Sequence, residues 1–287
     1  MITVGSGKFT YRLVEGWGKL PDGWKYTQVA GVVVDENDNV YVFNRGEHPM
    51  IIFDRDGKFL YSWGEGIFQQ GAHGMWLGTD GNLYLANHQN HTVKKFTRDG
   101  KLLMTLGIEG VMGEEGKPFR SPTGVAVSQS GEIYVSDGYN NQRVHKFSPD
   151  GKLITSWGEK GESEGQFAVP HGIFVHKNGT VYVADRENHR IQIFTPDGEF
   201  ISQWRTDFNM PCTLFIDNDD VVYIPELKYR LSILNLNGEL LARWGGTESH
   251  EPGQFVAPHI AYTDSHSDLY VGEVLEGQRI QKFEKVR

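Results

Sequence analysis

The segment VPHGIFVHKNGTVYVADRENHRIQIFTPDGEFISQW, residues 169–204, contains the pattern that decides the fold. Short runs of alternating apolar and polar residues are separated by turns that contain N-G or D-G. Such runs predict short antiparallel strands joined by tight turns. Related segments, 41 to 50 residues apart, begin at Val29, Gly71, Ser121, Met210 and Ala257. Six such units predict an all-β six-bladed β-propeller.

The last unit ends before its fourth strand, whereas the N-terminal segment FTYRLVEGWG, residues 9–18, ends in the same Trp-Gly as the outer strands of other units. We therefore predict that residues 9–18 complete the last blade and leave no free sheet edge. Residues 1–287 are expected to form a single domain. The repeats also resemble the NHL repeat, most closely in VYVADRENHRIQIF, residues 181–194.

The composition narrows the choice of compartment and partner. The 287 residues carry a net charge of −9, which argues against nucleic acid as a partner, because such proteins usually show a basic patch. No apolar stretch approaches the ~20 residues of a membrane helix, and the N-terminal residues do not resemble a signal peptide. With Cys212 as the single cysteine, an internal disulfide is impossible. These features predict a cytoplasmic protein.

Aligning the six units reveals a column of residues at the start of each innermost strand. In chain order the column is Ala30, His73, Thr123, His171, Cys212 and His259. Histidine occupies every second blade, and alternate blades of a six-fold ring place equivalent residues at the corners of a triangle around the axis. Three imidazoles with a fourth position open are typical of a catalytic zinc site. Iron, copper, manganese or cobalt would also suit these ligands, and the alternative is that each histidine caps a turn or packs in the core.

A second column lies where the second strand of each unit ends. Its members are all polar: Asn44, Asn87, Asp137, Asp185, Glu226 and Glu273. We interpret this column as structural, with hydrogen bonds to the turns of neighbouring blades.

The residues just beyond this column are expected to face the channel mouth near the metal. They are Arg45, His88, Gly138, Tyr139 and Arg186. An arginine can hold a substrate carboxylate with two hydrogen bonds. A tyrosine beside a cationic arginine and a metal has a lowered pKa, which makes Tyr139 a candidate base. The alternative for Arg45 and Arg186 is a surface ion pair.

These motifs resemble the peptidyl-α-hydroxyglycine α-amidating lyases, also called peptidyl-amidoglycolate lyases. In that family a six-bladed propeller cleaves a carbinolamide into a carboxamide and glyoxylate. The resemblance implies zinc ligands at His73 in AHGMWL, His171 in VPHGIF and His259 in APHIAY. It also implies a catalytic tyrosine at Tyr139 in SDGYN, an active-site arginine at Arg45 in NRGEH and a second arginine at Arg186 in ADREN.

The sequence departs from this family at several positions. Ile260 stands where animal members have an acidic calcium ligand, so the calcium site, whose other partner would be the backbone oxygen of Met75, is doubtful. Asn140 replaces a disulfide cysteine and Asn44 replaces a histidine. No copper monooxygenase domain is attached, so a separate hydroxylating enzyme would have to supply the substrate.

Two other functions remain open from the sequence. A metal-dependent lyase or hydrolase could act on a different small hydroxy acid or a lactone-like molecule, although a lactonase would need an acidic metal shell. A non-catalytic NHL-repeat module that binds RNA or protein would need a basic or apolar face and gives no reason for alternating histidines. The expected partner is therefore a small-molecule or peptide-derived substrate that carries a carboxylate.

Overall fold

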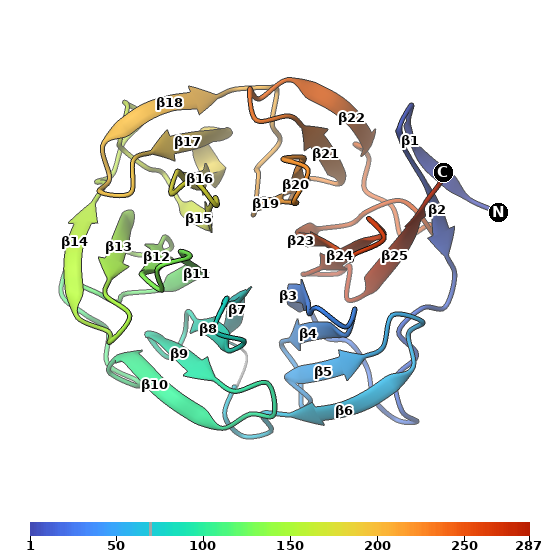
Figure 1. The fold of residues 1–287 in the computed structure, drawn as a ribbon, viewed down its shortest axis with the longest axis horizontal. Coiled ribbons are helices and arrows are strands. Elements are labelled where there is room, and N and C mark those ends of the chain that lie inside the picture. The colour runs from blue at the N-terminus through green and yellow to red at the C-terminus, as the bar shows by residue number, and fades with distance from the viewer. Residues whose placement is uncertain (69–70) are drawn as a thin grey trace. The chain divides into compact units, whose positions relative to one another are not determined.

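A computed structural model describes residues 1–68 and 71–287 of the chain. Within these residues the chain forms six antiparallel sheets, and the predicted all-β fold with six propeller blades is confirmed (Figure 1). The chain divides into two compact units, residues 1–70 with 214–287 and residues 71–213. The single-domain organisation stays a prediction.

Unit 2, residues 71–213, contains three four-stranded blades. The second blade has β7 (Ala72–Leu77), β8 (Leu83–Asn87), β9 (Thr92–Phe96) and β10 (Leu102–Gly107). The third has β11 (Pro122–Val127), β12 (Ile133–Asp137), β13 (Arg143–Phe147) and β14 (Leu153–Trp157). The fourth has β15 (Pro170–Val175), β16 (Val181–Asp185), β17 (Arg190–Phe194) and β18 (Phe200–Trp204), with the short 3₁₀ helix η1 (Arg186–Asn188) after β16.

Unit 1 contains the first, fifth and sixth blades. The first has β3 (Val29–Val34), β4 (Val40–Asn44), β5 (Met50–Phe53) and β6 (Phe59–Trp63). The fifth has β19 (Phe215–Ile216), β20 (Val222–Glu226), β21 (Arg230–Leu234) and β22 (Leu240–Gly245). The sixth has β23 (Pro258–Thr263), β24 (Leu269–Glu273) and β25 (Ile280–Lys285), followed in the sheet by β2 (Phe9–Val14) and β1 (Thr3–Ser6).

The sixth blade joins the two ends of the chain. Strand β2 pairs antiparallel with β25, with Tyr11 opposite Lys285 and Val14 opposite Lys282. The predicted strand within residues 9–18 is therefore present, although it ends at Val14. Strand β1 adds a fifth, outer strand to this sheet, which the repeat pattern did not predict.

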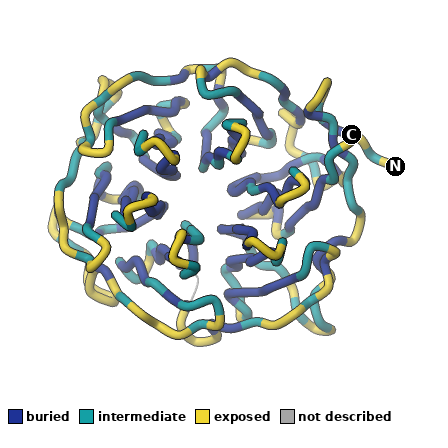
Figure 2. Tube along the Cα trace, viewed as in Figure 1, coloured by how far each residue is buried: buried dark blue, intermediate teal, exposed yellow. Residues whose placement is uncertain are grey.

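In each blade the second strand is more buried than the outer strand (Figure 2). The second strand of the third blade, β12, is buried at every residue, whereas its outer strand β14 is exposed at its first two residues. Apolar side chains of successive sheets pack into shared clusters, such as the one that joins Phe147 of the third blade to Leu106 of the second. Each fully buried apolar side chain of this kind adds about 1.5–3 kcal/mol to the free energy of unfolding.

The second polar column has a structural role, but its hydrogen-bond partners differ from those we expected. The Asp137 carboxylate accepts the backbone N–H groups of Arg120 and Ser121, and Asn44 Oδ1 accepts that of Thr27. These donors belong to the segment that leads into the first strand of the same blade. The expected bonds to neighbouring blades' turns are therefore wrong for Asp137 and Asn44. Their side chains instead hold the start of their own blade against its second strand.

None of the helices in the described part of the chain is long and apolar enough to cross a membrane.

Candidate active site and metal centre

The three column histidines lie at irregularities in their strands. In β15 the pairing with β16 passes from Pro170 to Gly172 and leaves His171 as the extra residue. The pairing of β7 with β8 shifts around His73, and that of β23 with β24 shifts around His259. An extra residue in one strand bends it and redirects the side chain. All three histidines are almost fully buried, with exposed fractions of 0 to 2%.

Each histidine directs Nδ1 at a backbone carbonyl of the next blade. The acceptor is always the column residue of that blade: Thr123 O for His73 (2.6 Å), Cys212 O for His171 (2.8 Å) and Ala30 O for His259 (2.8 Å). A carbonyl oxygen can only accept, so Nδ1 must carry the hydrogen in each ring. A neutral imidazole in this tautomer presents Nε2 as a lone pair, which is the arrangement usually found in metal-binding histidines.

The hydroxyl of Tyr139 lies between two of these rings in unit 2. Tyr139 Oη is 2.9 Å from His73 Nε2 and 3.1 Å from His171 Nε2, although the histidines lie 66 and 32 residues away in the chain. The centroids of the two imidazole rings are 4.7 Å apart. A neutral phenol carries one proton and can donate to only one ring nitrogen at a time. Two lone pairs directed at one hydroxyl form a cluster suited to a shared cation.

Arg186 and His88 complete the cluster in unit 2. The Arg186 guanidinium lies 5.5 Å from the Tyr139 ring centroid. Burial by itself lowers the pKa of Arg186, but Cys212, Tyr139 and Glu187 outweigh this effect and raise the pKa above its usual value. The His88 ring packs edge-on against the rings of Tyr139 and His73, with centroid distances of 5.4 Å in both cases. Arg186 thus keeps its positive charge beside the phenol.

Gly138 allows the Tyr139 turn to approach the fourth blade. A Cβ atom at Gly138 would lie 2.2 Å from the backbone oxygen of Pro170, a distance that real Cβ contacts do not reach. Only glycine therefore fits at this position without a shift of backbone.

The other two predicted site residues lie in unit 1. His259 lies in β23, and Arg45 follows the last residue of β4. Arg45 Nη1 donates to Gln28 Oε1 at 2.8 Å, and the Arg45 backbone N–H donates to the Gln28 carbonyl at the same distance. These contacts hold the Arg45 backbone against the segment that leads into β3.

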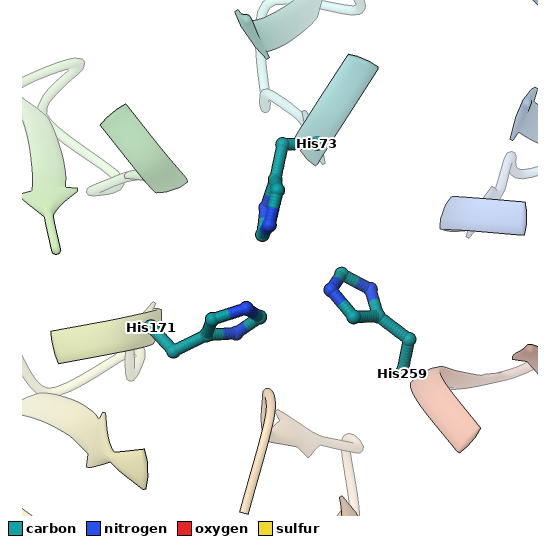
Figure 3. Close-up of side chains that lie close together, drawn as sticks. All are labelled: His73, His171 and His259. Carbon is teal, nitrogen blue, oxygen red and sulfur yellow. The ribbon is translucent and has the colours of Figure 1, made fainter. Parts of the chain in front are cut away.

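The donor set fits a metal ion. His73 and His171 of unit 2 can each offer one ring nitrogen to a metal ion, and His259 of unit 1 can offer one nitrogen of the same kind (Figure 3). Because Nδ1–H is hydrogen-bonded in every ring, Nε2 is the nitrogen whose lone pair can bind a metal. Three imidazoles without a carboxylate suit zinc, copper, iron or nickel better than magnesium or calcium.

Sequence reasoning missed the contribution of the histidine-free blades. Thr123, Cys212 and Ala30 carry no imidazole, yet their backbone carbonyls orient the three rings. The signal that could have revealed this role is the alternation itself, because every histidine is followed in the column by a residue without a ring.

Comparison with known proteins identifies relatives along most of the chain. The NHL-repeat family profile matches residues 119–147 and 167–194. Human NHL repeat-containing protein 3 is 30% identical over 96% of this chain and 84% of that protein. Drosophila melanogaster peptidyl-alpha-hydroxyglycine alpha-amidating lyase 1 is 32% identical over 79% of this chain and 47% of that protein.

A longer relative and a solved structure of lower sequence identity also match most of this chain. Mouse peptidyl-glycine alpha-amidating monooxygenase is 32% identical over 86% of this chain, which spans only 29% of that protein. The solved structure of a streptogramin B lyase matches with a TM-score of 0.70 and 13% identity, over 96% of this chain and 97% of that chain, which shows the fold alone. The chain belongs to the NHL-repeat propeller family that includes the peptidyl-α-hydroxyglycine α-amidating lyases.

Proposed function

We propose that this protein is a metal-dependent lyase that cleaves the C–N bond of an α-hydroxyglycine-type carbinolamide to give an amide and glyoxylate. The observation that carries the proposal is the Tyr139 hydroxyl in contact with Nε2 of both His73 and His171. The lyase name of the Drosophila melanogaster relative, which matches 79% of this chain, supports the same reaction class.

His73, His171 and His259 would hold the metal, with zinc as the proposed ion. When bound, such an ion acts as a Lewis acid that stabilises negative charge on a substrate oxygen. The chain's own contribution is to fix the tautomer of each ligand through its Nδ1–H bond, so that no change of tautomer is needed on binding.

Tyr139 is proposed to act as the base. The positive charge of Arg186 favours its phenolate form, because the guanidinium lies over the ring. The phenolate takes the proton of the substrate hydroxyl, the C–O bond becomes a carbonyl, and the C–N electron pair leaves on the amide nitrogen. The proton on Tyr139 then passes to that nitrogen, so the products are a neutral amide and glyoxylate and Tyr139 is ready for another turnover.

The two arginines are proposed to divide the binding work. Arg186 is already engaged by Glu187, with a 2.9 Å ion pair, and by the Tyr139 ring, so its role is to orient the phenolate. Arg45, which Gln28 holds through a 2.8 Å hydrogen bond, would bind the substrate carboxylate by its positive charge. The proposed partner is a carboxylate-bearing substrate made by a separate hydroxylating enzyme, and a cytoplasmic location belongs to the same proposal.

Metal analysis and an assay for glyoxylate test this proposal together. The purified protein is expected to contain close to stoichiometric zinc and to release glyoxylate from N-benzoyl-α-hydroxyglycine, with loss of both after chelation. His171→Ala should lose the metal. His266→Ala, whose side chain is 47% exposed and lies 3.8 Å from Asp38, is the matched control and should keep it.

Two results would contradict the proposal. Full activity in a metal-free preparation would exclude the metal-dependent scheme. A metal-loaded protein that hydrolyses lactones but releases no glyoxylate would show that the reaction class is wrong.

A further inference from the structure

The turn that carries Tyr139 is longer than the matching turns of the neighbouring blades. Asp137 pairs with Arg143 across this turn, which leaves five residues, 138–142, between them. In the fourth blade Asp185 pairs with Arg190, which leaves four residues, 186–189. A longer turn has more conformations to lose when it is ordered. The Tyr139 turn therefore needs additional contacts to be held in a single conformation.

Asn141 supplies a contact that the fourth blade also has. Asn141 Nδ2 donates to Asp137 Oδ2 at 2.7 Å, and Asn188 Nδ2 donates to Asp185 Oδ2 at 2.8 Å. Each of these asparagines also donates to a backbone carbonyl at 2.9 Å. Asn141 therefore performs an ordinary role at the end of a blade, and it does not account for the additional residue.

Asn140 makes a contact that is specific to the longer turn. Its Nδ2 donates to Ser121 Oγ at 2.7 Å. Ser121 is 4% exposed, and its own backbone N–H donates to Asp137 Oδ1 at 2.6 Å. The Asn140 side chain is thus hydrogen-bonded to Ser121, which Asp137 in turn holds next to the first strand of the third blade.

We propose that Asn140 is a positioning residue that, through Ser121, keeps the Tyr139 hydroxyl between the rings of His73 and His171. Asn140 directly follows Tyr139 in the chain, so movement of the Asn140 backbone displaces the phenol. Proton transfer depends steeply on the distance between the groups involved, and small displacements in active sites are costly. The catalytic consequence rests on the proposed function, whereas the restraint on the turn does not.

A double-mutant cycle measures the catalytic consequence. Asn140→Ala and Ser121→Ala are each expected to lower kcat about five- to tenfold with KM changed less than about twofold, because the loss of one hydrogen bond loosens the base but leaves the substrate contacts in place. The double variant should be no slower than the slower single variant, since both changes break the same bond. Asn235→Ala is the control. It removes a 2.6 Å side-chain bond to Glu239 in an exposed turn of the fifth blade and should leave kcat unchanged.

Hydrogen–deuterium exchange of the segment 136–144 tests the restraint without any assay of activity. Exchange should rise in Asn140→Ala and Ser121→Ala and stay at the wild-type level in Asn235→Ala. Unchanged exchange in both variants, or losses in kcat that multiply in the double variant, would overturn the inference. If the wild-type protein releases no glyoxylate, the proposed function fails, and the exchange measurement alone then decides whether Asn140 restrains the turn.

Discussion

Replacing Tyr139 by phenylalanine removes one oxygen atom from the centre of the cluster and leaves the ring in place. The edge-on contacts of that ring with His73, His88 and His171, at centroid distances of 5.4 to 5.6 Å, do not involve the hydroxyl. The change therefore removes the proposed base and its hydrogen bond, while it preserves the packing.

The expected effect on the rate is much larger than the effect on stability. Loss of a positioned acid–base group costs about 100- to 10,000-fold in kcat, which corresponds to about 3–5 kcal/mol of activation free energy. The hydroxyl donates one neutral hydrogen bond, so the free energy of unfolding should fall by only about 0.5–1.5 kcal/mol. For a chain of this size that is a decrease of a few degrees in Tm, at about 2–4 °C per kcal/mol.

The assay is the release of glyoxylate from N-benzoyl-α-hydroxyglycine at saturating substrate, with metal content and thermal unfolding measured on the same samples. Tyr61→Phe is a suitable control, because Tyr61 is 39% exposed on the outer strand β6. A Tyr139→Phe variant that is folded, metal-loaded and within tenfold of the wild-type rate would refute the assignment of Tyr139 as base. A variant that loses its metal would instead show that the hydroxyl mainly organises the ligands.

Two further predictions concern stability. Gly138→Ala should lower the free energy of unfolding by about 1–3 kcal/mol, because the new Cβ would lie 2.2 Å from the backbone oxygen of Pro170. Chemical denaturation measures this loss. A change below about 0.5 kcal/mol would show that the turn adapts freely. Burial by itself raises the pKa of Asp80, but hydrogen bonds from Lys95 and Asn82 lower the pKa to about 2. The ionised carboxylate therefore stabilises the folded state at pH values above its ordinary pKa. This stabilisation is lost as the pH falls toward 2. Because the Asp80 side chain is 39% exposed, Lys95→Met should cost only about 0.5 kcal/mol at pH 7, and the difference from wild type should shrink below pH 4 in urea titrations; a difference that persists at pH 3 or grows would contradict this account.

Much of the fold could be predicted because the repeat has a strong local signal. Strand alternation and glycine turns predicted the six blades, and the Trp-Gly at residues 17–18 pointed to the strand that pairs with β25. The outer strand β1 escaped prediction because its TVGS sequence has no equivalent in the other units. The partners of Asp137 were also misassigned, because a column in an alignment does not show which backbone N–H groups a carboxylate reaches.

The sequence by itself determined the blade pattern and the registration of three histidines in alternate blades, because strand period and repeat length are local properties of the chain. Tertiary structure alone decided which nitrogen each ring presents and that the Tyr139 hydroxyl meets His73 and His171. The two contacts of Tyr139 join residues 32 and 66 positions apart, and they depend on strand irregularities and on one additional residue in a turn. Local periodicity carries no information about such distances, whereas the packing of one blade against the next sets them directly.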